Sequence, residues 1–181
     1  MYNLWLVIIN FILIILTVPN ATNPGPVDGL NVLYANVRGF VNFKDISKSN
    51  ELFTSKIKDF HGHIFSSQPD VVILNETWLK KPILDSEIFP NNSYEIFRRD
   101  RSLKSHPLDK NYPDKFKKNG GGVIIAIKSN LAIKSTKYKI SAEILSVVLE
   151  PDRGCNIRIT TFYRVETLGA EKLVYDVSLQ I

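Results

Sequence analysis

The sequence predicts an α/β fold in which a helix and stacked sheets form layers. Two segments, 71–74 and 123–127, are apolar at every position. A strand with that pattern is buried on both faces. A helical segment, 49–65, would cover one face, and a second sheet would cover the other. With 181 residues, of which 44% are hydrophobic, the chain is long enough to bury such a core.

The expected elements follow one another from residue 30 onward. The helix at 49–65 begins after a cap at Ser49 or Asn50 and places apolar side chains at helical spacing: Leu52, Phe53, Ile57, Phe60 and Ile64. Segments rich in strand-forming residues, bounded by Gly, Pro or Asn, predict six strands: 30–40, 71–79, 93–101, 120–128, 143–150 and 156–164.

Composition and charge exclude some classes of protein and favour one class of partner. The net charge of +5 and the isoelectric point near 9.2 favour a polyanionic partner. The single cysteine, Cys155, excludes an internal disulfide framework and a cysteine-based zinc site.

The first thirty residues differ from the rest of the chain. Residues 4–18 are apolar except for Asn10 and Thr17, a length that suits a secretory signal but is short for a hydrocarbon core of about 30 Å. A signal or membrane-associated segment, a buried helix or strand, and a leader without function here all stay open. Residues 20–29 hold two Pro and two Gly, which indicates a linker. We therefore expect an apolar leader (1–19), a linker (20–29) and a domain that begins near Leu30.

Two predicted strands end in side chains that can bind a metal. Asn36 follows the apolar residues of one strand, and Glu76 follows VVILN in the next. If the strands are neighbours, an amide oxygen and a carboxylate converge at one edge of the sheet. Mg²⁺ is often held by one or two carboxylates, with water and substrate phosphate in its other positions. The alternative is that each residue only solvates the end of its strand.

Five motifs occur in an order that resembles the endonuclease/exonuclease/phosphatase family: LYANVRGF, QPDVVILNETWL, YEIFRRDR, GGGVIIAIK and TTFYR. The resemblance runs from residue 30 to 164 and is strongest to the endonuclease domain of non-LTR retrotransposons of the jockey and chicken-repeat kind. It implies a four-layer α/β sandwich, with two sheets face to face and helices outside. It also implies a Mg²⁺-dependent (or Mn²⁺-dependent) phosphodiesterase that cuts DNA.

The resemblance assigns roles position by position. Asn36 would position the metal or the phosphate, and Glu76 would bind the metal. The Tyr163 phenol would donate to the scissile phosphate, although a tyrosine packed in the core is the alternative. Arg99 and Arg101 fall in an element that lies near the DNA surface in the family.

Other family motifs do not occur in this sequence. The chain has no GDFN and no SDH, and the likeness ends at Arg164, before a divergent tail at 165–181. We therefore expect a partial four-layer sandwich whose second half is missing, and a DNA endonuclease domain that is incomplete and inactive alone. If the six strands form mostly one sheet, its inner face should be partly exposed, at Val71, Ile73, Val123, Ile125 and Val147.

A basic segment is the main candidate for a DNA contact. Residues 98–118 hold eight Lys or Arg against three Asp, a net charge of +5. Lys115, Lys117 and Lys118 would bind phosphates with an affinity that falls as salt rises, unless the segment is merely a solvated loop.

Three hypotheses about function follow. The chain is an incomplete Mg²⁺-dependent endonuclease, a nucleic-acid-binding remnant without catalysis, or a membrane-tethered or secreted fragment with no nuclease role. The partner expected is the DNA backbone, with membrane contact through residues 4–18 and no obligate protein partner. The leader favours a secretory or membrane location, whereas the family resemblance favours the nucleus.

Overall fold

The computed structural model describes residues 3–9, 12–18, 29–40, 46–80, 82–102, 120–139, 143–150 and 156–163. Its helices are α1 (Ile46–Ser67), the short α2 (Asp85–Ile88) and the 3-10 turn η1 (Pro90–Asn92). Its strands are β1 (Asn3–Ile9), β2 (Ile12–Val18), β3 (Val32–Asn36), β4 (Val71–Asn75), β5 (Tyr94–Arg99), β6 (Val123–Lys128), β7 (Ile133–Lys139), β8 (Glu143–Leu149) and β9 (Asn156–Tyr163). All six predicted strands are present, although their bounds shift by a few residues.

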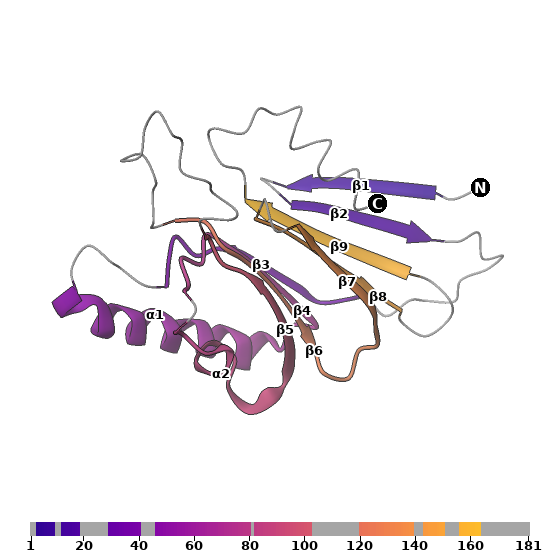
Figure 1. The fold of residues 1–181 in the computed structure, drawn as a ribbon. Coiled ribbons are helices and arrows are strands. Elements are labelled where there is room, and N and C mark those ends of the chain that lie inside the picture. Colours follow the sequence, from indigo (N-terminus) through magenta and orange to yellow (C-terminus); the bar gives the residue numbers. More distant parts are fainter. Residues whose placement is uncertain are drawn as a thin grey trace, which may run out of the picture.

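The strands form two sheets. The first has the order β3-β4-β6-β5, with β3 and β4 parallel and the other pairs antiparallel. The second has the order β1-β2-β9-β8-β7 and is antiparallel throughout. Figure 1 shows the first sheet between α1 on one side and the second sheet on the other. The prediction of a layered α/β fold is confirmed at this coarse level.

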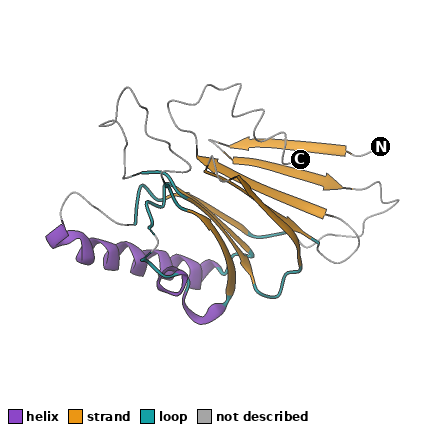
Figure 2. Cartoon of the chain, viewed as in Figure 1, coloured by secondary structure: helices purple, strands orange, loops and turns teal. Residues whose placement is uncertain are grey.

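Helix α1 covers the outer face of the first sheet (Figure 2). Ile57 and Phe60 of α1 are buried in one cluster with every second residue of β4 and β6: Val72, Leu74, Ile124 and Ala126. The Phe60 ring meets the rings of Phe40 and Phe89 edge-on, at centroid distances of 5.5 and 5.4 Å. The helix begins at Ile46, three residues before the expected cap at Ser49. Of the five predicted core positions, Leu52 and Phe53 lie outside the residues whose side chains are described.

The other face of the first sheet packs against the second sheet. Residues of both sheets form one buried cluster: Val71, Ile73, Val123, Ile125, Ile127, Leu145, Val147, Leu149 and Ile159. The expectation that Val71, Ile73, Val123, Ile125 and Val147 would be exposed was wrong, because each is 0% exposed. The error was one of sheet assignment. The segments 143–150 and 156–164 belong to the second sheet, together with β7, which the sequence did not predict.

The apolar leader also belongs to this sheet. Its backbone forms the hairpin β1–β2, and β2 pairs antiparallel with β9, so that Leu16 lies opposite Ile157. The structure thus gives strands over 3–9 and 12–18, whereas a role as a signal or membrane-associated segment stays a prediction. Among the described residues, no helix is long and apolar enough to cross a membrane. Residues 20–28 of the expected linker lie outside the described residues.

Candidate functional site

The ends of several strands meet at one edge of both sheets. In the first sheet, Asn36 at the end of β3 lies opposite Asn75 at the end of β4, and Asn75 lies opposite Val123 at the start of β6. In the second sheet, β8 begins at this edge with Glu143, which lies opposite Tyr163 at the end of β9. The edge therefore collects polar side chains from strands far apart in the sequence.

Asn36 and Glu76 are in direct contact at this edge. Asn36 Nδ2 donates a hydrogen bond to Glu76 Oε1 over 2.9 Å, and Asn36 Oδ1 accepts one from the Arg38 N–H over 3.1 Å. The structure thus brings the two residues together, but the amide nitrogen faces the carboxylate, in place of the expected amide oxygen. Because the amide turns its nitrogen toward the carboxylate, this hydrogen bond orients the Glu76 side chain through Oε1.

Glu76 leaves its strand in a turn that the neighbouring backbone holds. Its φ angle is +54°, and Trp78 has a φ of +55°, so both residues adopt the left-handed conformation. The Gly39 N–H donates to Glu76 O over 2.6 Å. Gly39 itself has a φ of +81°, and a Cβ atom there would overlap Cε3 and Cδ2 of the Trp78 indole. The indole therefore packs directly on the Gly39 backbone and supports the turn from beneath.

Asn75, directly before Glu76, joins the two sheets. Its side chain is buried, at 2% exposure. Thr161 Oγ1 donates to Asn75 Oδ1 over 2.6 Å, and Asn75 Nδ2 donates to Phe162 O over 3.4 Å. The end of β4 is consequently fixed to the end of β9, so the distance between Glu76 and the second sheet is constrained by a buried amide.

The negative charge of Glu76 affects the pKa of two nearby tyrosines, Tyr163 and Tyr34. Burial raises the pKa of the Tyr163 phenol above its ordinary value of 10.0, and the negative charge of Glu76 adds to this effect, while Arg101 opposes it. Burial and the charge of Glu76 likewise raise the pKa of Tyr34, and a hydrogen bond with Asn75 acts in the opposite direction. Both phenols are therefore protonated at neutral pH and able to donate hydrogen bonds.

Arg101 and Glu143 form a buried ion pair beside Tyr163. Arg101 Nε donates to Glu143 Oε1 over 2.8 Å, and the two side chains are 7% and 0% exposed. The Gly122 N–H donates to Glu143 Oε2, also over 2.8 Å. Burial raises the pKa of Glu143, whereas the hydrogen bonds from Arg101 and Gly122 lower it. The Arg101 guanidinium lies over the Tyr163 ring, with Cζ 5.1 Å from the ring centroid.

The resemblance places Arg101 in an element near the DNA surface. In the structure the Arg101 side chain is 7% exposed and its guanidinium is directed into the protein, toward Glu143. Arg99, at the end of β5, is half-buried. The predicted phosphate contacts Lys115, Lys117 and Lys118 lie outside the described residues.

Glu76 does not belong to a larger cluster of metal ligands among the described residues. They hold no group of three or more His, Cys, Asp or Glu side chains that could bind an ion. Of the histidines, His61 and His63 lie on α1, where His61 Nε2 donates to the Ile88 carbonyl over 3.0 Å, and His106 falls outside the described residues.

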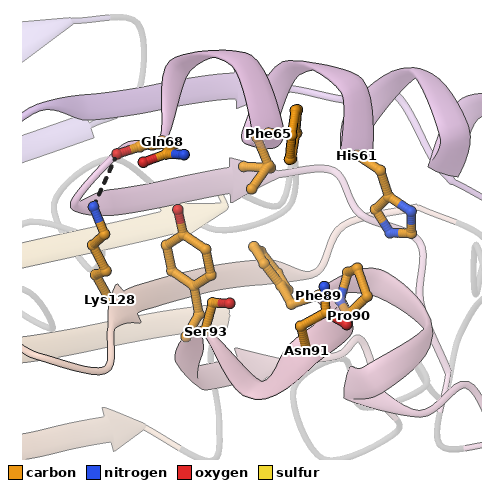
Figure 3. Close-up of a pocket in the computed structure, with 10 residues that line it drawn as sticks. His61, Phe65, Gln68, Phe89, Pro90, Asn91, Ser93 and Lys128 are labelled. Carbon is orange, nitrogen blue, oxygen red and sulfur yellow. Dashed lines mark hydrogen bonds between the residues drawn. The ribbon is translucent and has the colours of Figure 1, made fainter.

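A pocket at the opposite end of β5 and β6 is separate from this edge. Figure 3 shows it between the C-terminal half of α1 and the η1 turn, with Phe65, Phe89 and Pro90 in its wall. Two of the polar side chains that line it are engaged in hydrogen bonds: Tyr94 Oη donates to Pro69 O over 2.7 Å, and Lys128 Nζ donates to Gln68 O over 3.4 Å. We therefore place the candidate site at the Asn36–Glu76 edge.

The sequence argument missed three contributors to the edge: Asn75, Glu143 and the glycines 120–122. Glu143 stands at the head of an apolar strand, as Glu76 stands at the end of one, so the same signal could have identified it. No protein-family model matches the chain, and no curated protein is significantly similar to it.

Proposed function

We propose that residues 30–164 are the N-terminal part of a Mg²⁺- or Mn²⁺-dependent phosphodiesterase domain of the endonuclease/exonuclease/phosphatase family, with DNA as substrate. The observation that carries the proposal is the contact between Asn36 and Glu76 at the ends of two parallel strands. It brings together the two positions to which the five sequence motifs assign metal and phosphate roles.

The layering of the chain is compatible with this proposal. The family has a four-layer sandwich of helix, sheet, sheet and helix. Helix α1 and the two stacked sheets correspond to three of those layers within the part of the chain that is described. The finer assignment to this family fold rests on the motifs as well as on the layers.

The residues present fit a hard divalent cation. Mg²⁺ usually takes one or two carboxylates and fills its other positions with water and phosphate. Glu76 supplies one carboxylate, which Asn36 orients through Oε1. An ion bound there would polarise a phosphate oxygen of the substrate.

Tyr163 suits the role of a hydrogen-bond donor to the phosphate. Its raised pKa keeps the phenol protonated at neutral pH, and the Arg101–Glu143 pair beside it limits where the ring can lie. A neutral donor near Glu76 binds a phosphate oxygen without adding a negative charge to the edge.

The proposal includes binding but not hydrolysis by these 181 residues alone. The family activates water with an Asp of the GDFN motif and uses a His of the SDH motif, and neither motif occurs in this sequence. We expect the chain to leave supercoiled plasmid uncut in Mg²⁺.

The test is paramagnetic broadening by Mn²⁺ in the full 181-residue chain. Mn²⁺ should broaden NMR signals near Asn36 and Glu76, and Glu76→Gln should abolish the effect. Glu95→Gln is the matched control, because Glu95 is an exposed glutamate on β5 and should leave the broadening unchanged. Broadening that survives Glu76→Gln, or no broadening at all, would refute the proposed metal site.

A second candidate, DNA binding without any catalytic role, is favoured by the charge of residues 98–118. Salt-dependent DNA binding that is indifferent to Mg²⁺ and to Glu76→Gln would support it over the first.

A further inference from the structure

The buried ion pair of Arg101 and Glu143 is an unusual feature for a structural core. Withdrawing two charges from water is costly, and apolar side chains of similar size often give equal or greater stability. The carboxylate is fully buried and accepts hydrogen bonds at both oxygens, from Arg101 Nε and from the Gly122 N–H. A buried polar group whose hydrogen bonds are all satisfied is rigid, so it also restricts the positions of the residues that contact it.

The backbone of residues 120–122 wraps closely around this pair. All three residues are glycines with positive φ angles, of +127°, +65° and +84°. A Cβ atom at Gly121 would overlap Glu143 Oε2 and would lie 2.5 Å from Arg101 Nη2, and one at Gly120 would lie 3.1 Å from Arg101 Nη1. Glycine is required at 120 and 121 because the peptide backbone passes directly over the paired side chains.

The same glycines hold the turn that carries Glu76. The Thr77 N–H donates to Gly122 O over 3.3 Å, and the Trp78 N–H donates to Gly121 O over 3.0 Å. A non-glycine residue keeps the left-handed conformation, as Glu76 and Trp78 do, only when the surrounding structure imposes it. The ion pair and its glycines supply that constraint from one side of the turn.

The other side of the ion pair reaches Tyr163. Glu143 lies opposite Tyr163 in the β8–β9 ladder, and the Arg101 guanidinium lies over the Tyr163 ring. The buried pair is thereby linked to both candidate site residues. Backbone hydrogen bonds of the glycines connect it to the turn at Glu76, and Arg101 contacts Tyr163 directly.

We propose that the Arg101–Glu143 ion pair is a positioning element that sets the Glu76 turn and the Tyr163 ring relative to each other. Its role in orienting metal and phosphate rests on the proposed function, whereas its effect on the turn and the ring does not. Arg101 thus acts through its neighbours, although the resemblance places it near the DNA surface.

A neighbouring arginine provides a matched control. Arg98 lies on β5, is also largely buried at 15% exposure, and pairs with Asp85 at 2.8 Å and Asp100 at 2.6 Å. Its guanidinium binds the carbonyls of Lys80 and Ile83 and not the glycine segment. Arg98→Met removes two ion pairs while leaving the Arg101–Glu143 pair and its hydrogen-bonded glycines in place.

The experiment compares Arg101→Met, Glu143→Gln, Arg101→Lys and Arg98→Met in the full chain. One readout is the ¹⁹F signal of Trp78 after labelling with 5-fluorotryptophan; the chain has two tryptophans, and Trp5→Phe assigns the other signal. The second is the ring signal of Tyr163 after ¹³C-tyrosine labelling, assigned with Tyr163→Phe. The third is the Mn²⁺ affinity measured by broadening.

We expect Arg101→Met and Glu143→Gln to shift both the Trp78 and Tyr163 signals and to weaken Mn²⁺ binding about tenfold, as the loss of an outer-shell partner does. Arg101→Lys keeps the charge and should shift the signals less. Arg98→Met should leave all three readouts near wild type, even where it lowers the melting temperature.

Unchanged Trp78 and Tyr163 signals in the Arg101 and Glu143 variants would overturn the inference, as would equal shifts in Arg98→Met. If Arg101→Met does not fold, Arg101→Lys and Glu143→Gln decide by the same criteria. A wild-type chain that binds no Mn²⁺ would refute the proposed function alone, because the two NMR signals still test the positioning.

Discussion

Adjacent residues of β6 allow a direct test of how the two sheets are packed. Ile124 and Ile125 are both 0% exposed, but Ile124 faces α1 and Ile125 faces the second sheet. We predict that Ile124→Ala and Ile125→Ala lower the free energy of unfolding by similar amounts. If the second sheet did not cover the inner face, Ile125→Ala would behave as a surface substitution.

The magnitude follows from complete burial. Replacing Ile by Ala removes three carbon atoms, each worth about 0.8 kcal/mol when buried, or about 2.4 kcal/mol in total. The cavity left behind adds to this loss, so each substitution should cost about 3–4 kcal/mol, within the range measured for such changes. The lower strand propensity of Ala affects both variants equally, because both sites lie on the same strand.

Urea and thermal unfolding of the two variants beside wild type provide the measurement. A loss of about 3 kcal/mol corresponds to a fall of about 6–12 °C in the melting temperature of a domain of this size. A loss below about 0.5 kcal/mol for Ile125→Ala, the usual range for a surface site, together with the full loss for Ile124→Ala, would refute the face-to-face packing.

Three further predictions concern the candidate site and its surroundings. Because the folded state raises the pKa of Tyr163, the stability that its proton confers is fully present below the unfolded pKa of about 10 and is lost as pH rises above that value through the higher folded pKa. Tyr163→Phe should reduce this alkaline loss in pH-dependent unfolding. Gly39→Ala should destabilise the fold by about 1–2 kcal/mol from backbone conformation alone, and should shift Trp78 fluorescence, whereas a neutral effect would contradict the packing of the indole on Gly39. Reversing the charge of Lys115, Lys117 and Lys118 should weaken binding of all DNA sequences alike. The slope of log affinity against log salt concentration should fall in magnitude by about 0.9 per lost phosphate contact. Unchanged affinity would mean that this segment is only solvated.

The sequence alone determined the strands that form the centre of the fold. Segments 71–74 and 123–127 are apolar at successive positions, and this pattern has one physical solution in a layered protein, burial on both faces. The structure has this arrangement, with alternate residues of β4 and β6 in the two core clusters. The spacing of Ile57 and Phe60 likewise predicted which face of α1 is buried.

Other elements could not be read from local pattern. Strand β7 reads IKSTKYK, which has too few apolar residues to indicate a strand, and it is defined by its ladder with β8. The leader is apolar nearly throughout, so its sequence did not distinguish a membrane segment from a strand; in the structure its backbone forms a hairpin that pairs with β9. The assignment of strands to sheets failed for the same reason, because periodicity reports which faces are buried and not which strands are neighbours.

The candidate site was likewise predicted from the sequence only in part. A polar residue at the end of an apolar strand is visible in sequence, and this is how Asn36 and Glu76 were found. Their hydrogen bond depends on β3 and β4 being parallel neighbours, and the pairing of Arg101 with Glu143 joins residues 42 positions apart. Local sequence therefore determined which side chains lie at the end of each strand. The pairing of strands and the stacking of sheets decided which of those side chains meet. Such contacts join segments far apart in the chain, and no local sequence pattern relates those segments to each other.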